Sequence, residues 1–295
     1  MPSFLLVLLG LLFSQTTIGS PVVNIEKPAD YLVDAEWLAS ALAKKDLRIL
    51  DIRSKADYED RHIKGAVSLP VEQLFASGHR NDLVAPIGEI QKLLSKKGVG
   101  PGTTVVVYDD GTLNDAARAF WVLELYGHDH VHLLDGGFHA WKKRRFSISS
   151  TVTIPDPKTF IPTVKANRLA TKLSTRLAMN NPNVVILDAR SELEYIGKET
   201  HTGKYGRIPT SINVPTTELF SEIDGVRYLK HKNEIAEIYG SIDSRKKVIT
   251  YCNIGKKSAL TYFNLRRLGH DTANYDGSWK EWGGDSSLPI EPNKL

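Results

Sequence analysis

Apolar and polar positions along this 295-residue chain follow two alternating kinds of pattern. Short unbroken apolar or β-branched runs, such as Val184–Leu187 and Val248–Tyr251, are typical of strands buried on both faces of a parallel sheet. Between these runs, Ile235, Ile238 and Tyr239 are spaced as on one face of a helix. Strands that alternate with helices in this way predict α/β domains with right-handed crossovers.

The same pattern occurs twice, at a spacing of about 140 residues, which is too long for a solenoid repeat. Four blocks recur in the same order: 47–60 in 184–197, 62–75 in 207–220, 105–111 in 248–255, and 125–143 in 267–282. We therefore expect two copies of one domain, over residues 25–146 and 165–295. Each copy is expected to hold a mainly parallel central sheet flanked by helices.

Residues 147–164 connect the two copies and contain the Ser-, Thr- and Pro-rich stretch "SISSTVTIPDPKTFIP". This composition predicts an extended linker. Because Ile154, Phe160 and Ile161 are apolar, we expect the linker to lie against both domains rather than hang free.

The first twenty residues differ from the rest, because "FLLVLLGLLF" (4–13) is an apolar run without charge. A membrane-spanning helix needs about 20 apolar residues, so this run fits the centre of a secretory signal peptide better. We expect residues 1–20 to be cleaved near Gly19 or Ser20 and the protein to be exported, periplasmic or secreted. The alternative is an uncleaved N-terminal membrane anchor.

Overall composition is that of a soluble globular protein, with 41% hydrophobic and 24% charged residues and a formal charge of +4. The mild charge and the lack of long basic runs give no reason to expect a nucleic-acid partner. The nine histidines show no metal-ligand spacing, so we expect neither metal nor cofactor. We expect a monomer.

Cys252 is the only cysteine, and it directly follows the apolar run that ends at Tyr251. Ligands of open parallel sheets bind at the carboxyl ends of strands. The loop Asn253–Ser258 then leads into a helical pattern, so loop N–H groups and the positive helix end favour a thiolate. Lys256 and Lys257 add positive charge. These features indicate a nucleophile rather than an inert core thiol.

The chain resembles the tandem-domain rhodanese family of sulfurtransferases. The resemblance rests on the two copies, the Cys-x-x-Gly loop, "LDARSELEY" (187–195) and "YDGSWKEWGG" (275–284). It implies that the C-terminal copy is catalytic and that the N-terminal copy, with Asp109 opposite Cys252, is not. It also implies a reaction in which Cys252 takes a sulfur from thiosulfate, becomes a persulfide and passes the sulfur to cyanide or a thiol.

Alternatives within the family remain open. The two lysines suit doubly charged thiosulfate, and 3-mercaptopyruvate is the alternative donor. A further alternative is a persulfide relay or binding module without turnover. A phosphatase of the Cys-x₅-Arg type shares the fold, but Ser258 stands where its arginine would grip phosphate.

The resemblance and the loop together define the candidate site around Cys252. The substrate-binding candidates are Asn253, Ile254, Gly255, Lys256, Lys257, Ser258 and Arg190, with Asp188 in a supporting role. For Arg190 we favour an ion pair with Asp188 over substrate contact, and for Ser258 a helix cap over a hydrogen bond to the persulfide.

Two neighbouring positions depart from the family's pattern. Glu194 stands where some members place a second arginine for anionic substrate, so we do not expect that clamp here. Arg207 replaces the histidine of a Gly-His-Ile motif and is a third candidate, with Lys256 and Lys257, for holding the anion. Trp279 is expected at the mouth of the cleft, while Trp141 and Trp282 are expected in the core.

Overall fold

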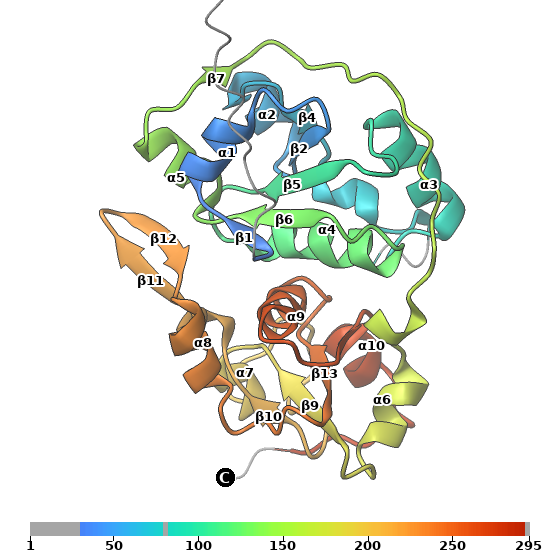
Figure 1. The fold of residues 1–295 in the computed structure, drawn as a ribbon. Helices are drawn as coiled ribbons and strands as arrows, with labels where there is room; N and C mark the ends of the chain where they lie inside the picture. The colour runs from blue at the N-terminus through green and yellow to red at the C-terminus, as the bar shows by residue number, and fades with distance from the viewer. Residues whose placement is uncertain (1–29, 79–81, 293–295) are drawn as a thin grey trace, which may run out of the picture.

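The computed structural model describes residues 30–78 and 82–292, which fold into two α/β domains (Figure 1). The predicted signal peptide, residues 1–20, lies outside the described residues. Among the described residues, no helix is both long and apolar enough to cross a membrane. Each domain is built on a five-stranded sheet in which all neighbouring strands are parallel, which confirms the predicted fold class.

The N-terminal domain has the sheet order β1-β6-β5-β2-β4, with β5 at the centre. Its strands are β1 (Leu32–Val33), β2 (Leu47–Asp51), β3 (His62–Ile63), β4 (Val67–Ser68), β5 (Thr104–Tyr108), β6 (Val131–Leu134) and β7 (Ile148–Ser149). Its helices are α1 (Ala35–Ala41), α2 (Lys55–Asp60), η1 (Val71–Leu74), α3 (Ile87–Lys96), α4 (Asn114–Leu125) and α5 (Gly137–Lys143). The short strands β3 and β7 pair separately.

The C-terminal domain repeats this order as β10-β9-β13-β14-β8, with β13 at the centre in the place of β5. Its strands are β8 (Leu169–Ala170), β9 (Val184–Asp188), β10 (Ile212–Asn213), β11 (Phe220–Ile223), β12 (Val226–Leu229), β13 (Lys247–Tyr251) and β14 (Thr272–Tyr275). Its helices are η3 (Ala166–Arg168), α6 (Lys172–Ala178), α7 (Glu192–Tyr195), η4 (Thr216–Leu219), α8 (Lys232–Ile238), α9 (Lys257–Arg267) and α10 (Ser278–Gly284). The matching orders confirm the sequence repeat as a structural one.

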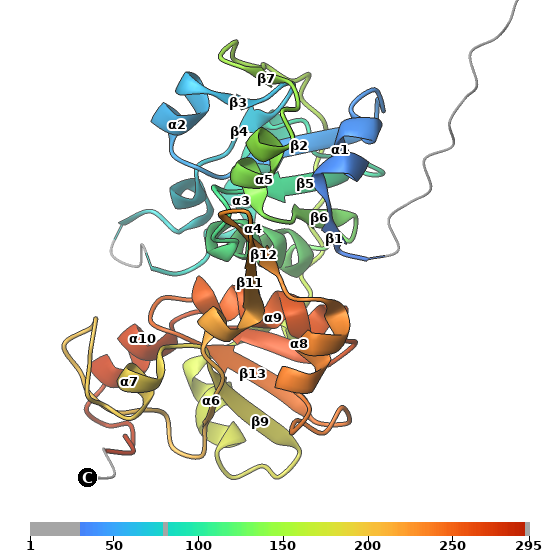
Figure 2. The same ribbon diagram turned by 90° about the vertical axis from the view of Figure 1, so that its left-hand side faces the viewer.

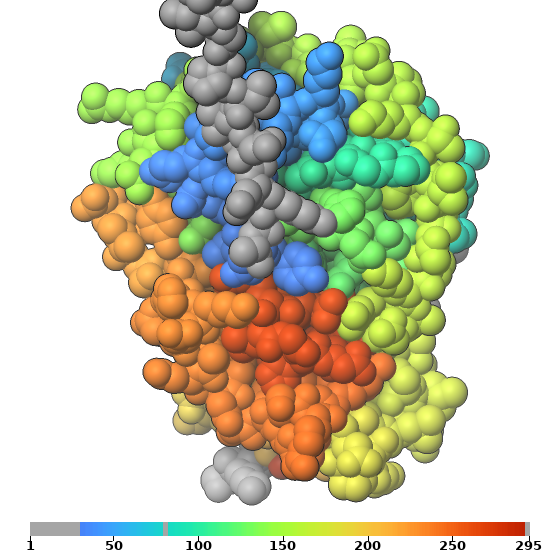
Figure 3. Space-filling model, in the orientation of Figure 1, coloured from blue at the N-terminus to red at the C-terminus, as the bar shows by residue number. Residues whose placement is uncertain are grey.

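The helices α4 and α9 face each other between the two sheets, and one apolar core continues through both of them. At its centre, the rings of Phe120 and Phe263 meet edge to face with centroids 4.9 Å apart. Beside this pair, the buried Glu124 receives hydrogen bonds from Arg266 (2.8 Å) and from the Tyr262 hydroxyl. Figure 3 shows the domains in contact across this face, so they form one packed unit.

Each domain also sends a loop onto the other. The β11–β12 hairpin leaves the C-terminal domain and packs against α5 (Figure 2), where the Leu229 N–H donates to Asp135 at 3.0 Å. In the opposite direction, the Val84 N–H donates to Asp276 at 2.6 Å. Asp135 and Asp276 occupy matched Asp-Gly positions in the two copies. The domains are therefore interlocked by two equivalent contacts.

The linker is extended as predicted, and it forms backbone hydrogen bonds with the N-terminal domain. Phe160 is 3% exposed, and its N–H donates to the Ser95 hydroxyl at 3.0 Å. Ile161 is 67% exposed because neighbouring residues of an extended chain point to opposite sides. Ile154 is 88% exposed. The prediction that these two isoleucines pack against the domains is therefore wrong.

Candidate active site

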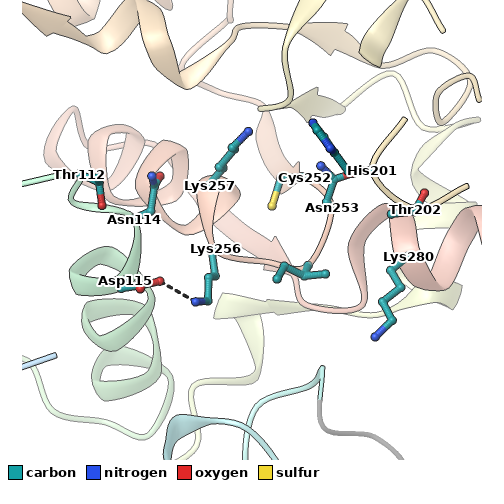
Figure 4. A pocket seen from close by; sticks show the side chains of 11 residues that line it. Thr112, Asn114, Asp115, His201, Thr202, Cys252, Asn253, Lys256, Lys257 and Lys280 are labelled. Atoms are coloured by element: carbon teal, nitrogen blue, oxygen red, sulfur yellow. Dashed lines mark ion pairs between the residues drawn. The ribbon is translucent and has the colours of Figure 1, made fainter. Parts of the chain in front are cut away.

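Cys252 lies directly after β13, at the carboxyl end of the central strand, and its sulfur points into a pocket between the domains (Figure 4). The residue is 1% exposed and free of any disulfide. Its N–H donates to the Ser278 hydroxyl at 3.2 Å, and its carbonyl accepts from the Trp279 N–H at 2.9 Å. The start of α10 therefore fixes the backbone on both sides of the thiol.

The loop after Cys252 is shorter than the sequence suggested, because α9 begins at Lys257 rather than after Ser258. The loop turns at Gly255, whose φ of +79° is a conformation that favours glycine. Its Asn253 carbonyl accepts from the Lys280 N–H at 3.0 Å, so α10 also holds this part of the loop. The thiol therefore starts a tight turn that leads directly into a helix N-terminus.

The prediction that Ser258 caps this helix is wrong. Lys256 is at the N-cap position, and no side chain caps α9. Ser258 lies inside the first turn, is 0% exposed and does not line the pocket. Its hydroxyl oxygen has no hydrogen-bond partner within the part of the chain that the structure describes. The first-turn N–H groups without a side-chain cap are donors that an anion in the loop can use.

The pocket has a volume of about 590 Å³ and is built from both domains. Its lining residues are Thr112, Asn114 and Asp115 from the N-terminal domain, and His201, Thr202, Cys252, Asn253, Ile254, Lys256, Lys257 and Lys280 from the C-terminal domain. The structure thus brings five predicted site residues together in one cavity. The N-terminal domain forms one wall of it, as Figure 4 shows for the helix that carries Asp115.

The lysines of the pocket are not equivalent. Lys256 forms an ion pair with Asp115 at 2.9 Å, across the boundary between the domains. Lys280 lies 3.5 Å from Asp82. For Lys257, no ion pair is present within residues 30–78 and 82–292. Lys257 is therefore the ammonium group of this pocket that is best placed to attract an anionic ligand.

Glu194 lies behind the loop and has a side chain that is 1% exposed. It accepts a hydrogen bond from the Asn253 amide at 2.7 Å, and His201 lies 3.9 Å away. Burial by itself raises the pKa of Glu194, but the Asn253 hydrogen bond and the charges of Lys257 and Arg190 outweigh it and hold this pKa below its usual value. The position at which some family members place a second arginine for anionic substrate therefore carries a negative charge in this chain.

Asp188 and Arg190 form the expected ion pair at 2.6 Å, and the Tyr251 hydroxyl donates to the same carboxylate. Arg190 is 1% exposed and does not line the pocket, so the geometry supports its role in holding the strand end and not substrate contact.

Trp279 packs 4.7 Å from the Arg190 guanidinium and is 0% exposed. Its predicted place at the cleft mouth is wrong, because the indole packs in the core and donates to the Lys204 carbonyl at 3.0 Å. Trp141 and Trp282 are buried as predicted.

Arg207 does not reach the pocket. It is 6% exposed, it pairs with Glu291, and its guanidinium stacks 4.6 Å from the Tyr195 ring. Of the three cations considered for anion binding, the structure therefore places only Lys256 and Lys257 at the cavity.

The matching loop of the N-terminal domain is folded around Asp109. This carboxylate accepts hydrogen bonds from the N–H groups of Gly111 (2.8 Å), Leu113 (3.0 Å) and Ala116 (3.3 Å). Burial raises its pKa to about 6, although these hydrogen bonds act in the opposite direction. The N–H groups of this loop and of the start of α4 therefore point at the first side chain after the central strand. In the N-terminal domain that side chain is the carboxylate of Asp109.

Sequence reasoning missed the part of the pocket that lies outside the cysteine loop. Asn114 and Asp115 begin α4, directly after the N-terminal loop, which is one residue longer than its counterpart. His201 and Thr202 lie in a segment between Tyr195 and Arg207 that the first copy lacks. A comparison of the two copies thus contains the signal, because most of these residues lie where the copies differ in length.

The family model of the rhodanese-like domain matches residues 34–144 and 171–285, once in each domain. The chain therefore belongs to the rhodanese-like sulfurtransferase family. It is 33% identical over 276 residues to a Mycobacterium tuberculosis protein named "Putative thiosulfate sulfurtransferase", covering 89% of this chain and 98% of that protein. It is 30% identical over 264 residues to the thiosulfate sulfurtransferase of Pseudomonas aeruginosa, covering 88% and 96%.

Solved structures share the fold at lower identity. The wild-type structure of EanB superimposes with a TM-score of 0.80 and 24% identity, covering 90% of this chain and 70% of that one. The anaerobic ergothioneine biosynthesis enzyme from Chlorobium limicola, in complex with trimethyl histidine, gives a TM-score of 0.78 at 23% identity, covering 90% and 71%. These similarities show the common architecture of the two domains.

Proposed function

We propose that this protein is a thiosulfate sulfurtransferase that works through a persulfide on Cys252. The thiolate attacks the outer sulfur of thiosulfate, a new S–S bond forms, and the bond to the sulfonate sulfur breaks with release of sulfite. Cyanide or a thiolate acceptor then attacks the outer sulfur of the persulfide. This second step yields thiocyanate, or a persulfide of the acceptor, and restores the Cys252 thiolate.

One observation carries this proposal. The only cysteine of the chain sits at the end of the central strand β13, in a loop that leads into an uncapped helix, and it faces a cavity between the domains. Persulfide chemistry needs a nucleophilic sulfur and donors for an anionic sulfur, and this position offers both. The matching position of the non-catalytic copy holds Asp109, an anion bound by N–H groups.

The outer sulfur of a persulfide needs its own partners once it forms. The first N–H groups of α9, which no side chain caps, and the buried Ser258 hydroxyl, which lacks a partner among the described residues, are candidate donors for this sulfur. Lys257 adds a positive charge from the pocket side. These groups stabilise a negative sulfur more than a neutral thiol, which favours the intermediate.

For the donor, the charge of the pocket favours thiosulfate. Three lysines, Lys256, Lys257 and Lys280, line the cavity that contains Cys252, and Lys257 forms no ion pair within the described residues. A dianion gains more from them than the monoanion 3-mercaptopyruvate, which remains the alternative donor. A persulfide relay without turnover is the further alternative.

A side-by-side comparison of initial rates with thiosulfate and with 3-mercaptopyruvate, each with cyanide, tests the proposal. We expect the larger kcat/KM with thiosulfate and complete loss with Cys252→Ser. A larger kcat/KM with 3-mercaptopyruvate would replace thiosulfate as the donor. Persulfide formation without turnover would favour the relay, and turnover by Cys252→Ser would refute the mechanism.

We also propose that residues 1–20 direct export and are removed. The apolar run at 4–13 is the observation behind this proposal. N-terminal sequencing of the protein recovered from its native cells tests it, and we expect a new terminus near Gly19 or Ser20. An intact N-terminus in the membrane fraction would instead indicate the uncleaved anchor.

A further inference from the structure

The catalytic loop is contacted by an arginine of the other domain. Arg118 lies on α4 of the N-terminal domain, and its Nη1 donates to the Gly255 carbonyl at 3.4 Å. The same carbonyl accepts from the Asn274 amide of β14 at 3.3 Å. A Cβ built on Gly255 would lie 2.7 Å from Arg118 Nη1, which shows how closely the guanidinium packs on the loop.

The surroundings of Arg118 are unusual for a residue that only joins two domains. Its side chain is 0% exposed and pairs with Asp276, while its carbon Cζ lies 4.4 Å from the Phe75 ring and 4.6 Å from the Trp121 ring. Within the described residues, its Nε and Nη2 are buried without hydrogen-bond partners. A buried cation with unpaired donors is costly, so stability alone does not explain it.

The internal repeat provides a direct comparison. Asp135 and Asp276 are matched residues, and each accepts an N–H from the opposite domain, from Leu229 and Val84 respectively. The sequence position in α9 that matches Arg118 in α4 is Leu260, which cannot donate a hydrogen bond. Arg118 therefore adds a direct ion pair to the Asp276 contact, and this cation also bonds the cysteine loop.

The contacts of Arg118 and Asn274 with the Gly255 carbonyl also affect the direction of the neighbouring N–H group. A trans peptide is planar, so the carbonyl of Gly255 and the N–H of Lys256 point in opposite directions. Holding the carbonyl against Arg118 and Asn274 therefore turns the Lys256 N–H away from them. Gly255 has no Cβ and adopts a φ of +79°, so its backbone has few steric constraints of its own, and contacts with other residues help to fix the orientation of this peptide.

We propose that Arg118 is a positioning residue through which the non-catalytic domain holds the Gly255–Lys256 peptide with its N–H facing the sulfur of Cys252. This inference rests on the proposed function, because it assigns the N-terminal domain a role in stabilising the thiolate and the persulfide. Arg118 does not touch the substrate. It acts through the orientation of one peptide group.

Two changes test the proposal by removing the two donors to the same carbonyl. Arg118→Met combined with Asp276→Asn removes the cation without leaving a lone buried charge. Asn274→Ala removes the second donor and leaves the domain interface intact. For each variant, the rate at which iodoacetamide alkylates Cys252 is measured against pH, and kcat and KM for thiosulfate are measured separately.

A matched control loosens the same interface without contacting the loop. Glu124→Gln combined with Arg266→Met removes the ion pair between α4 and α9 in which Arg266 donates to Glu124 at 2.8 Å. If Arg118 were only a link between domains, the control and the Arg118 variant would change stability and leave the alkylation profile alone.

We expect the Arg118/Asp276 variant and Asn274→Ala to move the midpoint of the alkylation profile about one unit higher, with kcat about tenfold lower and KM within about twofold of wild type. The control should keep the wild-type profile. A folded Arg118/Asp276 variant with an unchanged midpoint overturns the inference, and so does a control that shifts equally. If that variant does not fold, an unchanged midpoint in Asn274→Ala overturns it. The alkylation profile does not require sulfur transfer, so a wild-type protein without turnover refutes the proposed function alone.

Discussion

Asp109 and Cys252 occupy the same place in the two copies of one loop, each as the first residue after the central strand. Their carbonyls are held alike, since Phe138 N–H donates to Asp109 at 2.8 Å and Trp279 N–H donates to Cys252 at 2.9 Å. The Asp109 carboxylate is held by the N–H groups of its own loop. The first copy therefore carries a fixed anion where the second carries a thiol.

The raised pKa of Asp109 makes the stability of the N-terminal domain depend on pH. Its folded pKa of about 6 exceeds the ordinary value of 3.8, so the folded state holds the proton more tightly than the unfolded state. The resulting stabilisation is fully present below pH 3.8 and is lost as pH rises through about 6, amounting to about 3 kcal/mol for this group. We expect the free energy of unfolding, measured with urea at several pH values, to fall less for Asp109→Asn than for wild type as pH rises from 3.8 to above about 6.

The comparison with wild type isolates Asp109 from other titrating groups. Parallel stability curves for wild type and Asp109→Asn would show that this carboxyl does not titrate as described. Sulfur transfer by Asp109→Asn should stay within about twofold of wild type, because Asp109 does not line the pocket that contains Cys252.

The lysines of the pocket should contribute unequally to donor binding. Lys257→Ala should raise KM for thiosulfate by about tenfold, since this ammonium group has no ion pair among the described residues. Lys256→Ala is the matched control and should raise KM by less than about threefold, because Lys256 is paired with Asp115. Steady-state kinetics at fixed cyanide measure both, and a larger effect at Lys256 would contradict the assignment.

Glu194 should weaken the binding of a dianionic donor. Its carboxylate lies behind the loop and interacts with Lys257, so removing its charge leaves more of that lysine's field for the donor. Glu194→Gln keeps an acceptor for the Asn253 amide and should lower KM for thiosulfate by about fivefold, with little change in kcat. An increase in KM would mean that Glu194 supports the loop more than it repels the anion.

The hydroxyl of Ser258 should matter for chemistry and not for folding. It is buried without a partner in the described part of the chain, so Ser258→Ala should leave the free energy of unfolding unchanged or raise it by about 1 kcal/mol. If the hydroxyl donates to the persulfide, the same variant should lose about fivefold in kcat/KM for thiosulfate. A lower free energy of unfolding together with an unchanged kcat/KM would contradict both expectations for Ser258→Ala.

Much of the fold was predictable because it depends on local patterns and on the repeat. Unbroken apolar runs gave the strands around Leu187 and Tyr251, and the repeat gave two domains of equal design. The position of Cys252 followed from the rule that sites lie at strand ends. The prediction for Ser258 was wrong because the sequence alone does not distinguish a serine that caps a helix from one buried in its first turn.

The remainder of the site depends on how the two domains pack, which no local pattern records. Asp115 neutralises Lys256 from the other domain, and Arg118 reaches Gly255 from the same helix. In the sequence these residues are more than a hundred positions from their partners. Trp279 was predicted at the mouth of the cleft because its contact with the buried Arg190 guanidinium is likewise not apparent in the sequence.

The central claim is that Cys252 carries the transferred sulfur. Mass spectrometry of the intact protein after incubation with thiosulfate, followed by peptide mapping, tests it most directly. We predict the added mass of one sulfur atom on the peptide that contains Cys252, removal of that mass by cyanide, and no addition to Cys252→Ser. An unmodified Cys252 in a preparation that turns over thiosulfate, or the same added sulfur on Cys252→Ser, would contradict the account.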